Sequence, residues 1–255
     1  MTTPSLETRD LTIRFGGHVA VNRVSAAFRP GELTAIVGPN GAGKTTYFNL
    51  ISGQLAASSG QVLKDGTDLT GMAPSTRARH GIGRAFQLTN LFPALSVLEN
   101  IRLAVQARAG EGWRILRPVG RFGHLTEAAE RFLEATRLTH LAHQPAAALP
   151  HGDQRKLEVA LLMAMEPDIY MFDEPTAGMS LDHAPDVLDL IATIKTDPAK
   201  TVLLVEHKMD VIRALADRII VLHNGELLAD GPPAEIMDSQ VVRDVYLGTA
   251  TEETA

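Results

Sequence analysis

Residues 38–45 read Gly-Pro-Asn-Gly-Ala-Gly-Lys-Thr and match the phosphate-binding loop pattern G-x-x-x-x-G-K-S/T at every fixed position. The apolar run Leu33–Val37 comes before this loop, and a helical stretch, Lys44–Ile51, follows it and is closed by Gly53. Backbone N–H groups of a glycine-rich turn at the start of a helix form a site for polyphosphate. The sequence therefore predicts a strand–loop–helix unit that binds a nucleotide.

The start of this helix supplies the side chains with the clearest expected roles. Lys44 is predicted to reach the β- and γ-phosphates. Thr45 is predicted to give its hydroxyl to Mg²⁺, which prefers a few hard oxygen ligands and keeps its waters. The residues expected to contact the nucleotide here are Gly38, Pro39, Asn40, Gly41, Ala42, Gly43, Lys44, Thr45 and Thr46.

Composition limits the class of protein. The chain has 255 residues and is 45% hydrophobic, which suits one large α/β domain. Its formal net charge of −6 argues against nucleic acid as a partner. The absence of cysteine excludes a disulfide framework and suits a cytosolic protein. No apolar run approaches the roughly 18 residues of a membrane span, so at a membrane another chain must cross it.

Two kinds of strand are predicted from the apolar pattern. Leu6–Phe15 and Val19–Phe28 alternate apolar and polar residues around a Gly-Gly pair, which indicates a β-hairpin with one solvated face, and Gln61–Lys64 adds a short strand. Continuous apolar runs indicate parallel strands buried on both faces, at Leu33–Val37, Ile169–Phe172, Thr201–Val205 and Ile219–Leu222. The expected fold class is α/β, with a P-loop NTPase core, a mostly parallel sheet and an antiparallel β subdomain on the N-terminal side.

The middle of the chain is predicted to be helical. Ser96–Arg108 and Leu125–Arg137 form two helices, and Ala109–Gly123 between them reads as a loop. We expect a single domain over 1–255, with a helical subdomain at about 88–165 inserted in the nucleotide-binding core. Residues 232–255 are expected to form short helices and a tail.

Polar residues at the ends of other predicted strands complete a candidate active site. Asp173 is expected to hold Mg²⁺ through water, and Glu174 to polarise the attacking water as the general base. A neutral His207 imidazole can hydrogen-bond the γ-phosphate and orient that water. Gln87, after a short strand, is expected both to ligate Mg²⁺ and to sense the γ-phosphate. The predicted catalytic residues are Glu174, His207 and Gln87, and the predicted metal ligands are Thr45, Gln87 and Asp173.

Together these motifs resemble the ATP-binding subunits of ABC transporters, over nearly the whole chain from Leu6 to about Gly248. The resemblance implies that Phe15 stacks on adenine and that Ala20 also lies at the nucleotide. It implies that Gly152, in the family's signature segment, contacts ATP in trans, on the partner subunit. It places Asp182 in the D-loop of the dimer.

A narrower resemblance points to the ATPase subunits of branched-chain amino acid importers, with urea and short-amide importers close to them. The segments that carry it are 15–17, 20–22, 84–87, 91–93, 96–100 and 246–248. It implies hydrolysis of ATP with Mg²⁺ in a head-to-tail dimer with a second ATP-binding subunit, identical or different. It also implies transmembrane permease subunits, an indirect link to a solute-binding protein, and a peripheral place at the cytoplasmic face of the inner membrane.

The signature segment departs from the family pattern. The family has Leu-Ser-Gly-Gly-Gln where this chain has Leu149-Pro150-His151-Gly152-Asp153. Pro150 removes a serine hydroxyl, and Asp153 places a negative charge near a phosphate, a repulsion of about 2–3 kcal/mol at an effective dielectric constant of about 20. Arg155 and Lys156 lie close enough in sequence to offset part of this charge. We therefore predict weakened, but not abolished, capture of ATP between subunits.

Three rival classes stay open at this point. A non-transport ABC ATPase of DNA repair needs a long heptad insertion, and ribosomal members usually join two ATPase domains; the sequence has neither feature. A small-molecule kinase does not account for Gln87, Gly152 and His207 together. A module that binds ATP without turnover is argued against by Glu174 and His207. The transported substrate and the identity of the second ATPase subunit cannot be read from these motifs.

Overall fold

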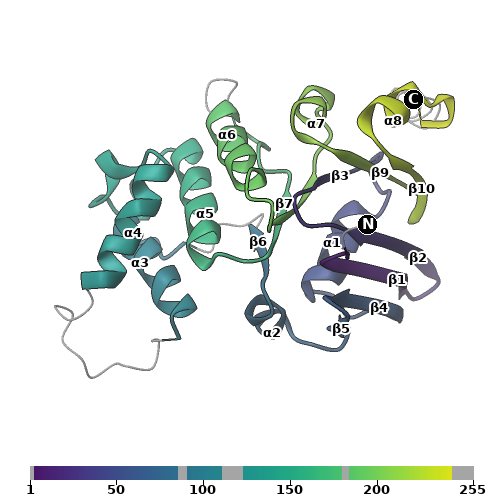
Figure 1. The fold of residues 1–255 in the computed structure, drawn as a ribbon, viewed down its shortest axis with the longest axis horizontal. Helices are drawn as coiled ribbons and strands as arrows, with labels where there is room; N and C mark the ends of the chain where they lie inside the picture. Colours follow the sequence, from purple (N-terminus) through teal and green to yellow (C-terminus); the bar gives the residue numbers. More distant parts are fainter. Residues whose placement is uncertain (1–2, 86–90, 111–122, 180–183, 243–255) are drawn as a thin grey trace. The chain divides into compact units, whose positions relative to one another are not determined.

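The computed structural model describes residues 3–85, 91–110, 123–179 and 184–242 (Figure 1). The chain divides into two compact units. The first consists of Met1–Ile82, Asp168–Glu174 and Lys195–Ala255, and the second of Gly83–Pro167 and Pro175–Ile194. Because the first unit is made of three separate segments, strands that are far apart in sequence meet inside it.

A six-stranded sheet has the order β10-β9-β3-β8-β7-β6, and all of its strands except β6 lie wholly in the first unit. β3 pairs in parallel with β8 and β9, β8 pairs in parallel with β7, and β10 pairs antiparallel with β9. Every residue of β3, β7 and β8 is buried, as expected for continuous apolar runs covered on both faces. The strands are β3 (Leu33–Val37), β6 (Ile82–Ala85), β7 (Ile169–Asp173), β8 (Thr201–Val205), β9 (Arg218–His223) and β10 (Glu226–Gly231).

An antiparallel sheet in the order β2-β1-β4-β5 makes the second layer of this unit. Figure 1 shows β1, β2 and β4 alongside one another. The alternating apolar side chains of β1 and β2 enter a core that they share with Ile36 of β3 and with Tyr47 and Phe48 of α1 (Lys44–Ser52). The strands are β1 (Leu6–Phe15), β2 (His18–Phe28), β4 (Ser59–Lys64) and β5 (Thr67–Asp68).

A buried arginine joins the end of α1 to the short helix α2 (Pro74–Arg79). Arg77 is 2% exposed, and its guanidinium donates to the carbonyl oxygens of Leu50 (2.6 Å), Ile51 (2.7 Å), Thr70 (2.6 Å) and Met72 (3.2 Å). The carbonyls at a helix end have no partner inside the helix. Arg77 therefore satisfies the end of α1 from within the core.

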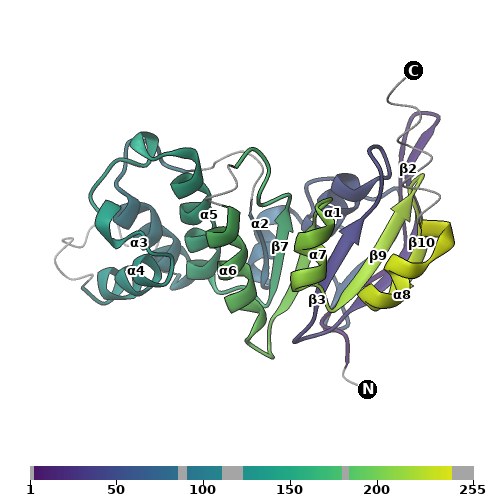
Figure 2. The same cartoon turned by 90° about the horizontal axis from the view of Figure 1, so that it is seen from above.

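The second unit is built from helices, as the sequence predicts. Figure 2 shows α3, α4 and α5 packed together. Their shared core includes Ile101, Leu133 and Leu157, and Ser96 caps α3 by accepting a hydrogen bond from the backbone N–H of Glu99. The helices are α3 (Val97–Arg108), α4 (Gly123–Ala135), α5 (His151–Met165) and α6 (Ala184–Lys195), with short 3-10 turns at Thr139–Leu141 and Ala146–Ala148.

Two more helices, α7 (Met209–Leu215) and α8 (Pro233–Asp238), belong to the first unit. Ile212 of α7 and Ile236 of α8 pack with Val37, Ile219 and Val221. None of the helices in the described ranges is both long and apolar enough to cross a bilayer. The α/β fold class predicted from the sequence is confirmed, whereas the boundaries of the helical subdomain stay a prediction.

Candidate nucleotide site

Three neighbouring parallel strands end at the candidate site. β3, β8 and β7 lie next to one another in the sheet, so their carboxyl ends share one edge. The loop 38–43 follows β3, Glu174 follows β7, whose last residue is Asp173, and His207 follows β8. Ligands of open α/β sheets bind at this edge. The sheet order therefore brings together groups that lie up to 169 positions apart in the sequence (207 − 38).

Glycine is required at two positions of the loop. Gly38 has φ +150°, and a Cβ there would lie 2.1 Å from the carbonyl oxygen of Leu222. Gly43 has φ +95°, and a Cβ would lie 2.5 Å from the carbonyl oxygen of Ala20. Real Cβ atoms do not approach backbone oxygens so closely, and side chains at positive φ are also strained.

Backbone hydrogen bonds hold the loop from outside. The N–H of Gly225 donates to the carbonyl of Ala42 (3.1 Å), and the carbonyl of Gly225 accepts from the N–H of Asn22 (2.8 Å). Pro39 and Ala42 are buried and Asn40 and Gly41 are exposed, so the outer side of the loop is open to solvent. The site is thus a shaped turn of main-chain groups at the N-terminus of α1, suited to a polyphosphate.

The side chain of Lys44 is held by the backbone of the phosphate-binding loop. Its Nζ donates to the carbonyl oxygens of Gly38 (2.7 Å) and Pro39 (2.9 Å). Burial lowers the pKa of Lys44, while the charges of Glu174 and Asp173 act in the opposite direction. The ammonium and the carboxylates therefore lie close enough to influence one another, as a shared phosphate and metal site requires.

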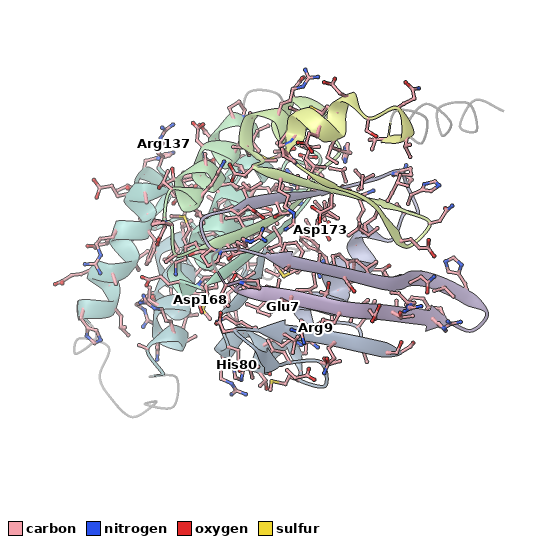
Figure 3. All side chains as sticks on the ribbon, turned by 45° about the vertical axis from the view of Figure 1, so that its right-hand side comes forward. Glu7, Arg9, His80, Arg137, Asp168 and Asp173 are labelled. Carbon is pink, nitrogen blue, oxygen red and sulfur yellow. The ribbon has the colours of Figure 1, made fainter. Side chains whose placement is uncertain are left out.

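The acids after β7 differ in their surroundings. Asp173 is 4% exposed, and Figure 3 marks its position at the sheet. The Glu174 side chain is 29% exposed, its backbone has φ +48°, and its N–H donates to the carbonyl of Val205 (2.9 Å). The Nδ1 of His207 lies 3.8 Å from Oε1 of Glu174. The predicted base and the predicted histidine are thus neighbours.

Glu206 is a member of the site that the sequence analysis did not identify. Its side chain is 1% exposed, its Oε2 accepts a hydrogen bond from the backbone N–H of His207 (2.9 Å), and it lies 3.7 Å from Nδ1 of that residue. A buried carboxylate that accepts this N–H fixes the backbone beside the histidine. The signal was an acid directly after an apolar strand, the same signal that identified Asp173.

The donor set suits Mg²⁺. Thr45 and Thr46 are half-buried in the first turn of α1, and Asp173 supplies a buried carboxylate at the adjacent edge. A hydroxyl and a carboxylate are hard oxygen ligands, and Mg²⁺ takes few of these from protein. Within the described ranges, no group of three or more His, Cys, Asp or Glu side chains forms a metal cage of the kind that zinc prefers.

Phe15 and Ala20 lie near the turn of the β1–β2 hairpin. The Phe15 side chain ends β1 and is 51% exposed, so a flat ligand can stack on it. Ala20 is half-buried in β2 and faces the loop through its carbonyl. Gln87 and Asp182 fall outside the described residues, so the roles predicted for them stay predictions.

The signature segment begins α5 in the second unit. Pro150 is the N-cap of the helix, and Gly152 is buried in its first turn. Lys156 pairs with Asp153 (2.7 Å), as the sequence analysis expected of a neighbouring cation. Arg155, the other expected partner, pairs instead with Glu158 (2.7 Å), because that residue lies one turn further along the helix.

Two family models match this chain. The family model described as ABC transporter matches residues 21–177, and the model described as branched-chain amino acid ATP-binding cassette transporter matches residues 226–252. The chain is 37% identical to the high-affinity branched-chain amino acid transport ATP-binding protein BraF of Pseudomonas aeruginosa, over 98% of this chain and 100% of that protein. It is 37% identical, with the same coverage, to LivG of Escherichia coli K12, which carries the same description.

Solved structures of ATP-binding cassettes share the fold. The ADP conformation of MJ1267, a cassette of an ABC transporter, aligns with a TM-score of 0.83 at 27% identity over 97% of this chain and 100% of that chain. A nucleotide-free cassette aligns with a TM-score of 0.81 at 26% identity over 96% and 99%. The dimeric structure of MJ0796 bound to ADP and Pi aligns with a TM-score of 0.75 at 25% identity over 89% and 98%.

Proposed function

The chain belongs to the ABC transporter family of ATP-binding proteins, and from this premise we infer that it hydrolyses ATP to power a branched-chain amino acid importer. One observation carries the ATPase assignment: Lys44, Asp173, Glu174 and His207 lie at or just after the carboxyl ends of neighbouring strands, at one edge of the sheet. The match over residues 226–252 supports the substrate class and favours it over urea or short amides.

Each residue of the edge has a proposed task. The N–H groups of loop 38–43 and the ammonium of Lys44 bind the phosphates, and Phe15 stacks on adenine. Glu174 accepts a proton from the attacking water, and His207, 3.8 Å from that carboxylate, orients the water toward the γ-phosphate. Buried Glu206 holds the backbone of His207 in place.

Thr45 and Asp173 are the proposed protein ligands of Mg²⁺, with Gln87 as a third. When bound, the ion neutralises phosphate charge and orients the leaving group. Burial makes Asp173 a poorly hydrated carboxylate, and a poorly hydrated carboxylate gains more from a nearby cation.

The family functions with dimers of ATP-binding subunits and with membrane subunits, and we extend this arrangement to the present chain. Gly152 and Asp182 would contact ATP held by a second ATPase subunit in a head-to-tail dimer. Permease subunits would cross the membrane, and the chain would work at its cytoplasmic face. ATP favours the closed dimer through contacts made only there, and hydrolysis removes them.

The decisive variant for the ATPase is Glu174→Gln. Loss of the general base is expected to lower ATP turnover by about 10²–10⁴-fold while ATP still binds. Phosphate release and binding of a fluorescent ATP analogue measure the two effects separately. Mass in solution with and without MgATP then reports whether the slowed variant forms a dimer.

Glu130→Gln is the matched control, because Glu130 is exposed on α4 in the second unit. It is expected to leave turnover and binding unchanged. Turnover of Glu174→Gln within about twofold of the wild type would exclude Glu174 as the base, since a general base contributes far more. Absence of ATP binding in the wild type would overturn the proposal as a whole.

The importer assignment has its own test. Cells that lack this chain are expected to lose uptake of labelled leucine, isoleucine and valine, and a plasmid copy is expected to restore it, whereas the Glu174→Gln copy is not. Unchanged leucine uptake with a loss of urea or short-amide uptake would assign the protein to the urea or short-amide importers instead. The ATPase assignment would survive that result.

A further inference from the structure

The first turn of α5 carries a charge network that the tasks above do not use. Oδ1 of Asp153 lies 2.7 Å from Nζ of Lys156, and these side chains are only 16% and 9% exposed. The same Nζ lies 3.5 Å from Oδ2 of Asp186 in the first turn of α6. Arg137, labelled in Figure 3, lies 3.5 Å from the other oxygen of Asp186. Figures 1 and 2 show α5 and α6 side by side.

The position of Asp153 makes its charge important. It directly follows Gly152, which is proposed to face the phosphates of ATP on a second subunit. A carboxylate there repels the phosphates, and its burial strengthens the repulsion because less water screens it. Something in this chain must therefore cancel that charge if ATP is to be captured.

Lys156 is suited to this task because it touches both acids. It is closer to Asp153 than to Asp186, and it is almost as buried as the core of the unit. Two acids and two bases make the network neutral as a whole. Removing Lys156 would take from Asp153 the cation 2.7 Å away, while Asp186 would keep Arg137 as a partner at 3.5 Å.

We propose that Lys156 is a positioning residue for the capture of ATP between subunits. Lys156 neutralises Asp153, and its contact with Asp186 fixes the first turn of α5 against α6. The proposal rests on the proposed function, because it requires the first turn of α5 to face ATP held by another subunit. It also accounts for how the chain works with an acid in place of the glutamine of the family pattern.

The alternative to this proposal is that the Lys156–Asp153 pair only stabilises its helix. An ion pair in α3 serves as a matched comparison. Glu99 and Arg102 form an acid–base pair at the same i, i+3 spacing, with side chains 38% and 12% exposed. Arg102 bonds Glu99 and Gln106, both on its own helix. Arg102→Met therefore removes a comparable helix pair without altering the charge beside Gly152.

The test measures ATP hydrolysis against ATP concentration in the transporter assembled with its permease subunits. Lys156→Met is expected to raise the KM for ATP about tenfold, because the carboxylate beside the phosphates is then uncompensated. Asp153→Asn in the Lys156→Met background is expected to return KM to within about twofold of the wild type, because it removes that charge. Arg102→Met is expected to leave KM unchanged.

A KM of Lys156→Met equal to that of the wild type would overturn the proposal, as would a double variant that fails to recover. Lower thermal stability with an unchanged KM would assign Lys156 a structural role only. The isolated Lys156→Met chain is expected to bind a fluorescent ATP analogue normally, because this lysine lies in the second unit. If the wild-type chain itself bound no ATP, the proposed function would fail, and this proposal with it.

Discussion

At the scale of single residues, the position of Lys44 serves phosphate binding and lowers the stability of the folded chain. Burial lowers the pKa of its ammonium even though Glu174 and Asp173 oppose the shift. The folded chain therefore holds this cation less favourably than water does. A polyphosphate that supplies negative charge reverses the balance, and functional sites are commonly maintained at such a cost to folding.

Lys44→Met is expected to abolish ATP binding and to change how stability depends on pH. The pKa of Lys44 lies below its ordinary value of 10.5 in the folded chain, so between these two pKa values the unfolded chain binds more protons. The free energy of unfolding of the wild type therefore rises with pH across that interval relative to Lys44→Met. Urea denaturation of both proteins from about pH 8 upward measures this difference. Parallel curves would contradict it.

At the scale of elements, Arg77 shows how a polar residue can be part of a core. The helix α2 has the sequence Pro-Ser-Thr-Arg-Ala-Arg, which has no apolar face to bury. Its place is fixed instead by the guanidinium, which bonds four carbonyl oxygens at the end of α1 and in the segment before α2. A lysine could not span these oxygens, because only a planar fork offers so many fixed donors.

Arg77→Met is expected to lower the free energy of unfolding by about 3 kcal/mol or more, because buried carbonyl groups lose a charged donor. Arg79→Met is the matched control on the same helix, since Arg79 is exposed and its guanidinium donates to the hydroxyl of Thr76 one turn away. The control is expected to stay within about 0.5 kcal/mol of the wild type. Urea denaturation of the three proteins measures both changes, and equal losses would contradict the buried role.

The sequence predicted well those elements whose residue pattern is typical of one kind of secondary structure. β3 and β8 have the predicted bounds, because a short run of five buried residues, four of them apolar, is typical of a strand covered on both faces. α2 was not predicted, because its position depends on a hydrogen-bonding side chain rather than on apolar spacing. β10 was not predicted either, since its residues are only partly buried and it is ordered by pairing with β9.

At the scale of the whole molecule, the two units divide the proposed work. The described residues expected to bind the nucleotide in cis lie in the first unit, and Gly152 lies in the second. The order of the strands explains how motifs far apart in sequence come together in the candidate site, because each motif lies at the end of a strand at one sheet edge. The Lys156–Asp186 contact was not predictable in this way, since it joins two helices and has no motif of its own.

Hydrogen exchange tests this division of work. MgATP added to the dilute, isolated chain is expected to protect backbone amides of loop 38–43 and α1, and to leave the first turn of α5 unchanged. In concentrated Glu174→Gln, where ATP is not consumed, protection is expected to reach the first turn of α5 because a second subunit brings its ATP there. Protection of α5 in dilute monomer would contradict binding by Gly152 in trans.

The loop at 38–43 is braced by main-chain atoms, and this has a consequence for how the protein tolerates mutation. The groups that hold it are the carbonyl of Ala20 and the peptide groups of Asn22 and Gly225. A substitution at Asn22 changes the side chain but leaves its peptide group in place, provided that the strand is kept. Asn22 is therefore freer to vary in sequence than the glycines inside the loop, whereas Gly225 is not, because it has φ +77° and a Cβ there would lie 2.7 Å from the carbonyl oxygen of Ala20. A mutational scan would find positions that tolerate substitution next to positions that do not.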